Sequence, residues 1–194
     1  MKAKYIFTPG PVKMSDDILA IGGMQTPYFR NAEFSAVLLE CERNLIEIAN
    51  APQGSRVIFL TSSGTGAMES AVANLLGPDD AALVINGGSF AQRFVDICSV
   101  HNIKFTNYRI HNDNLSDTSM LPVPRGTTAL LANGHETSIG VLYDLEAIGK
   151  FCRQNNLLNI VDAISMFITD EVDMNRQNID ALIISSHKGL AVQP

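Results

Sequence analysis

The amino-acid sequence predicts an α/β fold in which a mostly parallel sheet is flanked by helices. Short, almost wholly apolar runs alternate with amphipathic segments of helical periodicity, and Gly, Pro and polar residues separate the two kinds of segment. Continuous apolar runs are typical of strands buried on both faces, and their alternation with helices is typical of βαβ units. A third observation is that several of these runs end in clusters of small and polar residues.

In chain order, residues 1–30 are expected to be irregular, because prolines and glycines interrupt any periodic pattern. Apolar residues at helical spacing predict a helix over 33–49 that packs against another part of the protein. Residues 112–124 are read as a polar, Pro-containing connection. Strands are expected at 56–63, 81–86, 103–110, 127–134, 158–165 and 180–186, with helices at 65–76, 89–101 and 145–155 between them.

Composition and charge exclude several classes of protein. The chain of 194 residues is 46% hydrophobic and 18% charged, as expected for a globular protein with a sizeable core. Its formal net charge of −6 argues against nucleic acid and anionic membranes as partners. No apolar run approaches the ~20 residues of a membrane span, and no signal peptide is evident, so a cytoplasmic location is expected. The three cysteines lack metal-ligand spacing, and no metal site is predicted.

The residues that follow each strand are the candidate site, because ligands of open α/β sheets bind at the carboxyl ends of the strands. The strand at 104–110 ends without such a cluster, which suits an edge strand remote from the site. The other strands are followed by small, hydroxyl-bearing or charged residues, namely Ser62–Gly66, Asn86–Phe90, Asn133–Ser138, Asp162 and Ser185–Lys188.

The cluster Ser62–Gly66 is suited to binding phosphate. It opens a helix, whose first N–H groups attract anions, and its small residues let a ligand approach the backbone. A Walker loop is excluded because no Gly-Lys-Ser/Thr follows the glycines. A dinucleotide fingerprint is also excluded, because its third glycine is missing and Asn86 stands where an acid is expected. A plain capped turn remains the alternative.

Three further residues each allow a structural and a functional reading. Lys188 is a solvated lysine, a phosphate ligand or a Schiff-base nucleophile. Asp162 lies in an apolar run, where it caps the backbone or pairs with a cation supplied by a ligand. Phe90 is part of the core or stacks on a flat ring. Together these groups address a phosphate, an aromatic ring, a ring nitrogen and a carbonyl, which is the chemistry of pyridoxal 5'-phosphate.

The segments SSGTGAMES, VDAIS and SSHKG, in this order after FTPGPV, resemble those of the class V aminotransferases among the fold-type I pyridoxal-phosphate enzymes. The resemblance is to the group that includes alanine–glyoxylate, serine–pyruvate and 2-aminoethylphosphonate–pyruvate transaminases, and it covers essentially the whole chain. It implies that Lys188 forms the Schiff base and that Asp162 pairs with the ring nitrogen. It also implies that the other cofactor-binding residues are Gly64, Thr65, Gly66, Phe90, Thr137, Ile164, Ser185 and His187.

The resemblance also implies how the chain is divided. Residues 1–30 would be a segment that shapes the substrate pocket, and residues 31–194 a large cofactor-binding domain that is incomplete at its C-terminal end. Members of the family run to roughly twice this length and continue into a small domain that supplies an arginine for the substrate carboxylate. The sequence departs from the family pattern at two places. Gly134 stands where many relatives have a histidine, which is here at residue 135, and Phe29 stands at another position where a histidine is common. These departures concern the substrate and not the cofactor.

The expected function is transamination between a small amino acid or aminophosphonate and a 2-oxo acid, in a homodimer. The alternatives are a cysteine desulfurase or kynureninase-like lyase of the same fold, and a fragment that holds cofactor without turnover.

Overall fold

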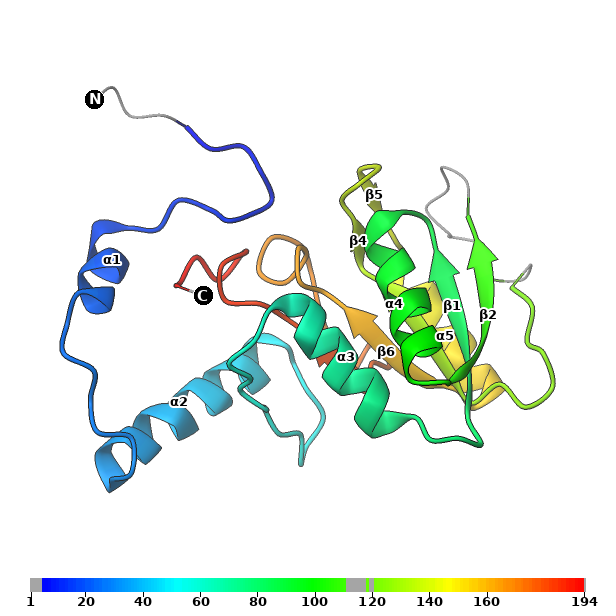
Figure 1. The fold of residues 1–194 in the computed structure, drawn as a ribbon, viewed down its shortest axis with the longest axis horizontal. Helices are drawn as coiled ribbons and strands as arrows, with labels where there is room; N and C mark the ends of the chain where they lie inside the picture. Colours follow the sequence, from blue (N-terminus) through cyan, green and yellow to red (C-terminus); the bar gives the residue numbers. More distant parts are fainter. Residues whose placement is uncertain (1–4, 111–117, 119–120, 194) are drawn as a thin grey trace.

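The computed structural model describes residues 5–110, 118 and 121–193. Five strands form a sheet in the order β2-β1-β3-β6-β7, and all of its neighbouring strands are parallel. This confirms the predicted α/β class with a parallel sheet (Figure 1). The strands are β1 (Ala81–Asn86), β2 (Lys104–Arg109), β3 (Ala129–Asn133), β6 (Leu158–Asp162) and β7 (Ala181–Ile183).

The helices cover both faces of the sheet. The side chains of a strand alternate between its two faces. Leu83 and Ile85 of β1 accordingly belong to the core that includes residues of α5 (Leu145–Asn155). Ala82 and Val84 belong to the core formed with α3 (Gly64–Leu75) and α4 (Ser89–Val100). β1 and β3, in the middle of the sheet, are therefore buried on both faces, which explains their continuous apolar sequences, whereas the edge strand β2 is only partly buried.

The predicted elements from residue 64 onward are present with small changes in their bounds. The strand predicted at the edge, β2, is at the edge of the sheet, next to β1. A short antiparallel hairpin of β4 (His135–Glu136) and β5 (Val141–Leu142) was not predicted. Residues 112–117, 119 and 120 of the predicted connection lie outside the described residues.

The predicted strand over residues 56–63 is wrong in this structure. Residues 55–60 have no regular secondary structure and pair with no strand of the described chain, and Ile58, Phe59 and Leu60 are 80%, 49% and 44% exposed. A cavity of about 490 Å³ lies between this segment and the end of β7, lined by residues that include Leu60 and Ile184. A strand needs a neighbouring strand for its backbone hydrogen bonds, and here the N–H of Val57 donates instead to the carboxylate of Glu42 at 3.0 Å.

The N-terminal region differs from the prediction in two respects. Residues 16–22, expected to be irregular, form the helix α1 (Asp16–Gly22), whose N-cap Ser15 accepts the N–H of Ile18. The predicted helix over 33–49 is present as α2 (Ala32–Ile48), but it has no buried residues. Figure 1 shows α1 and α2 projecting away from the sheet. The apolar spacing therefore identified the helix correctly, and Leu45 near its C-terminal end packs against the core, whereas Val37, Leu38 and Leu39 are exposed.

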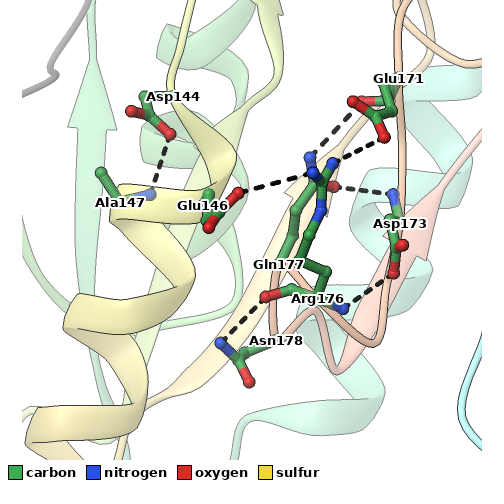
Figure 2. A network of polar contacts seen from close by, with 8 residues as sticks. All are labelled: Asp144, Glu146, Ala147, Glu171, Asp173, Arg176, Gln177 and Asn178. Atoms are coloured by element: carbon green, nitrogen blue, oxygen red, sulfur yellow. Dashed lines mark hydrogen bonds and ion pairs between the residues drawn. The ribbon is translucent and has the colours of Figure 1, made fainter.

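A network of polar contacts connects the segment between β6 and β7 with α5. Arg176 pairs with Glu171 at 2.8 Å and with Glu146 of α5 at 3.8 Å, and its N–H donates to Asp173. Asp144 caps the same helix by accepting the N–H of Ala147 (Figure 2). This network lies on the surface, where ion pairs contribute little stability. No helix in the described ranges has the length and apolar character needed to cross a membrane.

Candidate active site

The polar clusters that follow β1, β3, β6 and β7 meet at the carboxyl ends of these strands. Together with the start of α3 they surround a cavity of about 210 Å³. Nine of the ten predicted cofactor-binding residues line it, and the exception is Gly66. The cavity is lined by Ser63, Gly64, Thr65, Phe90, Arg93, His135, Thr137, Asp162, Ile164, Ser165, Ser185, His187 and Lys188.

The start of α3 forms one wall and offers backbone donors. Ser63 is the N-cap, and its Oγ accepts the N–H of Gly66 at 3.1 Å. The N–H of Gly66 is therefore already satisfied by the cap. The N–H groups of Gly64 and Thr65, the first two of the helix, have no acceptor within the helix. A Cβ on Gly64 would lie 2.6 Å from Cδ1 of Ile164, so the absence of a side chain keeps this wall close to the end of β6.

Asp162 ends β6 and is 6% exposed. Its Oδ2 accepts the Nδ2–H of Asn133 at 2.7 Å, and its Oδ1 accepts the N–H of Ile164 at 2.9 Å. Burial raises the pKa of Asp162 to about 6, although the Ile164 N–H and the Arg93 charge act in the opposite direction. The structure thus presents a buried carboxylate without a direct cationic partner among the described residues, which is suited to a cationic group of a ligand.

Phe90 is held by a buried glutamate that sequence reasoning did not single out. Glu136 is fully buried, and its carboxylate accepts the N–H groups of Phe90 at 3.3 Å and Ala91 at 2.9 Å, at the start of α4. It also accepts the N–H of Ser138 at 3.2 Å. A Cβ on Gly88 would lie 2.7 Å from Cδ of Glu136, so only glycine permits this approach. The first N–H groups of α4 are therefore already satisfied by a carboxylate, unlike those of α3.

Lys188 lies in the turn that follows β7, beside two other candidate residues. Ser185 Oγ and His187 Nδ1 are 3.2 Å apart. The N-terminal segment reaches this turn, since the N–H of Val12 donates to the carbonyl of His187. A Cβ on Gly10 would come 3.0 Å from Nζ of Lys188. Lys188 is only partly buried and has one side on the cavity.

Two residues after β3 complete the rim. Thr137 lines the cavity as predicted, and His135 lines it as well. The ring of His135 contacts the carbonyl of Ser165 through Nδ1 at 3.2 Å, and its Nε2 lies 3.6 Å from Asp170. The histidine that departs from the family pattern therefore lies at the cavity.

Arg93 is the second functional candidate that sequence reasoning missed. It lies one turn into α4, and its Nη1 donates to Oγ1 of Thr65 at 2.8 Å. Its guanidinium carbon also lies 4.6 Å from the centroid of the Phe90 ring. The spacing of three residues between Phe90 and Arg93 puts both on one face of the helix, a signal that could have identified it. Arg30, in the N-terminal segment, stacks on Phe29 at 4.8 Å and does not line the cavity.

A larger hollow of about 670 Å³ lies at the opposite ends of the strands. It is lined by Thr128 and Leu158, at the amino ends of β3 and β6, and is open to solvent. The candidate site is the smaller cavity, because the buried carboxylate, the lysine and the free helix N-terminus converge there. Within the described ranges, no group of three or more His, Cys, Asp and Glu side chains is arranged to hold a metal ion.

Comparison with known proteins gives a consistent family match. Residues 24–193 match the family described as Aminotransferase class-V. The chain is 29% identical to the 2-aminoethylphosphonate–pyruvate transaminase of Pseudomonas aeruginosa, over 100% of this chain and 53% of that protein. It is 28% identical to the alanine–glyoxylate aminotransferase of Oryctolagus cuniculus, over 98% of this chain and 49% of that protein. The chain thus spans about half the length of these curated relatives.

Solved structures show the same fold. An aspartate aminotransferase of subgroup IV from Thermus thermophilus is 30% identical, with a TM-score of 0.84 over 98% of this chain and 55% of that one. A cysteine desulfurase from Escherichia coli is more distant, at 17% identity and a TM-score of 0.64 over 88% of this chain and 46% of that one.

Proposed function

The chain belongs to the class-V aminotransferase family, and on this premise we propose that it forms the cofactor site of a pyridoxal-phosphate-dependent aminotransferase. The observation that carries the proposal is the convergence of Lys188, Asp162 and the open N-terminus of α3 on one cavity. Because the chain spans about half the length of its curated relatives, the complete activity and its substrates are part of the proposal.

The residues present fit the phosphate of this cofactor. The N–H groups of Gly64 and Thr65 point out of the start of α3, where the helix dipole favours an anion. Across the cavity, Ser185 and His187 present a hydroxyl and an imidazole. The start of α4 is occupied by Glu136, so α3 is the helix terminus that remains for an anion.

The residues also fit the ring. Phe90 and Ile164 line the cavity and would offer apolar surfaces to a flat aromatic group. Asp162 offers a buried carboxylate to a protonated ring nitrogen, which supplies the cation that this carboxylate lacks. Thr137 offers a hydroxyl to the ring's phenolic oxygen.

Lys188 and Asp162 are the proposed catalytic residues. When bound, pyridoxal phosphate would supply a carbonyl for the amino substrate and a cationic ring that withdraws electrons from the bond being broken. Lys188 would hold the cofactor, and its free amine would move the proton of the substrate α-carbon. Asp162 would hold the proton on the ring nitrogen, since a buried carboxylate favours the protonated form of its partner.

The proposed substrates are a small amino acid or aminophosphonate and a 2-oxo acid, by similarity to the relatives named above. Gly10 and Val12 contact the turn that holds Lys188, which supports a role of residues 1–30 in shaping the substrate pocket. The exposed apolar residues of α2, including Val37 and Leu39, support the proposal of a homodimer, because an obligate interface would cover them. A desulfurase has less support, and no observation on the described chain favours it.

The test is spectroscopic. Purified protein reconstituted with pyridoxal 5'-phosphate is expected to show the visible absorbance of a lysine-bound cofactor. Alanine, serine, aspartate and aminoethylphosphonate are then added one at a time, and the amino donor is expected to abolish this absorbance. A 2-oxo acid should restore it. Lys188→Ala is the control and should show neither change. Absorbance that no donor alters would support a cofactor-holding chain without turnover.

A further inference from the structure

Arg93 connects the two helix starts that border the cavity. Its Nη1 donates to Oγ1 of Thr65, the second residue of α3, at 2.8 Å. Its guanidinium carbon lies 4.6 Å from the ring centroid of Phe90, the second residue of α4. The arginine is partly buried and lines the same cavity as both of its partners. A long, flexible side chain is thus fixed at both a polar and an aromatic contact.

In the hydrogen bond between Arg93 and Thr65, the identity of the donor determines whether the Thr65 hydroxyl can itself donate to an anion. A guanidinium has donors and no acceptor, so the Thr65 hydroxyl must accept from Arg93 with one of its lone pairs. The hydroxyl proton is then directed away from the arginine. Because Gly64 and Thr65 both line the cavity, this proton is available to an anion held at the start of α3.

Phe90 keeps the guanidinium in this orientation. The backbone of Phe90 is fixed by Glu136, which accepts its N–H at 3.3 Å. The ring therefore forms a stable platform, and a cation stacked on it loses much of its rotational freedom. Among the described residues no carboxylate forms an ion pair with Arg93, so its charge acts on the cavity. One consequence is that Arg93 lowers the pKa of the buried Asp162 carboxyl, against the effect of burial.

We propose that Arg93 is a positioning residue that orients the Thr65 hydroxyl as a hydrogen-bond donor to the cofactor phosphate. This inference rests on the proposed function, since it takes the anion at α3 to be the phosphate of pyridoxal phosphate. Arg93 acts through Thr65, so its contribution depends on the presence of the hydroxyl and on a phosphate-bearing ligand.

A double-mutant cycle on binding tests this dependence. The dissociation constants of pyridoxal 5'-phosphate and of pyridoxal, which lacks the phosphate, are measured for the wild type, Arg93→Met, Thr65→Val and the double variant. Arg93→Met is expected to weaken pyridoxal 5'-phosphate binding about tenfold, the range for loss of a hydrogen bond that involves a charge. It should leave pyridoxal binding almost unchanged. In the Thr65→Val background the same substitution should have a much smaller effect.

The controls separate orientation from folding. Arg176→Met removes an arginine with comparable polar contacts outside the cavity and should leave both dissociation constants unchanged. Arg93→Lys keeps a cationic donor and should recover part of the affinity. If Arg93→Met does not fold, as judged by circular dichroism, Arg93→Lys and Thr65→Val carry the same comparison.

Three results would overturn the proposal: unchanged affinity in Arg93→Met, equal losses for both ligands, or losses that add fully in the double variant. Full additivity would mean that Arg93 contacts the phosphate itself. A wild type that binds no pyridoxal 5'-phosphate would instead contradict the proposed function.

Discussion

Asp162 lies at the end of β6, where opposing influences act on its carboxyl. Burial raises its pKa from the ordinary value of 3.8 to about 6, while the N–H of Ile164, the charge of Arg93 and the amide of Asn133 lower it. Such a carboxyl costs stability while the site is empty and gains a partner when a cationic ring is bound. Its sequence context, an aspartate in a buried strand, predicted this conflict.

Asp162→Asn is predicted to slow transamination on the order of 100-fold or more, because an amide cannot hold a proton on the ring nitrogen. The same substitution should not destabilise the cofactor-free protein. Oδ1 of Asn133 is buried without a hydrogen-bond partner, so its amide can turn and accept from the new Nδ2. Near-normal turnover of the purified variant would refute the role of Asp162.

The pH dependence of stability provides a second prediction about Asp162. Its folded pKa is above the unfolded value, so the folded state binds more protons and the wild type loses stability as pH rises from about 4 to about 6. Relative to Asp162→Asn, the free energy of unfolding of the cofactor-free wild type should fall over this range and stay constant above it. Urea unfolding at several pH values measures the difference. A difference independent of pH would show that the carboxyl is not perturbed.

At this scale, the sequence identified the residues whose chemistry is unusual for their position. Asp162 stands out because a buried strand rarely carries a charge, and Lys188 stands out as part of the polar cluster that follows an apolar run. Arg93 and Glu136 do not stand out, since an arginine in a helix and a glutamate in the polar stretch after a strand are both common. Their importance comes from tertiary contacts with Thr65 and with the start of α4, which residue types alone do not specify.

At the scale of elements, β1 was predicted with the bounds it has in the structure, and β3 within two residues of its bounds. β1 and β3 pair on both edges and are almost completely buried, so their apolar sequences have only one structural explanation. The segment 56–63 also contains an apolar run, at residues 57–60, but pairs with no described strand. An apolar sequence indicates a tendency to be buried in a sheet, but a strand forms only where a neighbouring strand pairs with it.

Glu136 is predicted to hold α4 in place. Glu136→Ala would leave the N–H groups of Phe90, Ala91 and Ser138 without their acceptor in a buried site, and should lower the free energy of unfolding by about 2–3 kcal/mol. Glu69→Ala is a matched control on α3, where the glutamate is half-exposed and pairs with His101. It should cost less than about 0.5 kcal/mol in the same denaturant titration. Equal losses for the two variants would contradict the capping role.

At the scale of the whole molecule, the described chain leaves large apolar surfaces uncovered. They lie along α2 and along residues 58–60, on either side of a cavity of about 490 Å³ that reaches the end of β7. One edge of the sheet, at β7, also has no strand beside it in the described chain. Both features favour association with further polypeptide.

A polypeptide of residues 1–194 on its own is therefore predicted to self-associate and to bind the dye anilinonaphthalene sulfonate. Ile58→Lys, at a position that is 80% exposed, should reduce both effects. Val100→Lys, at a similarly exposed position at the end of α4, should not. Size-exclusion chromatography and dye fluorescence measure the two properties. A monomer that binds no dye would contradict the interpretation of these surfaces.

The most direct test of the account is the identity of the lysine that carries the cofactor. The protein is incubated with pyridoxal 5'-phosphate and reduced with borohydride, and its tryptic peptides are analysed by mass spectrometry. Because Lys188 lines the cavity with Asp162 and the start of α3, we expect a single pyridoxyl label, on Lys188. A label on Lys150, which is exposed on α5, or no label on any lysine, would contradict it.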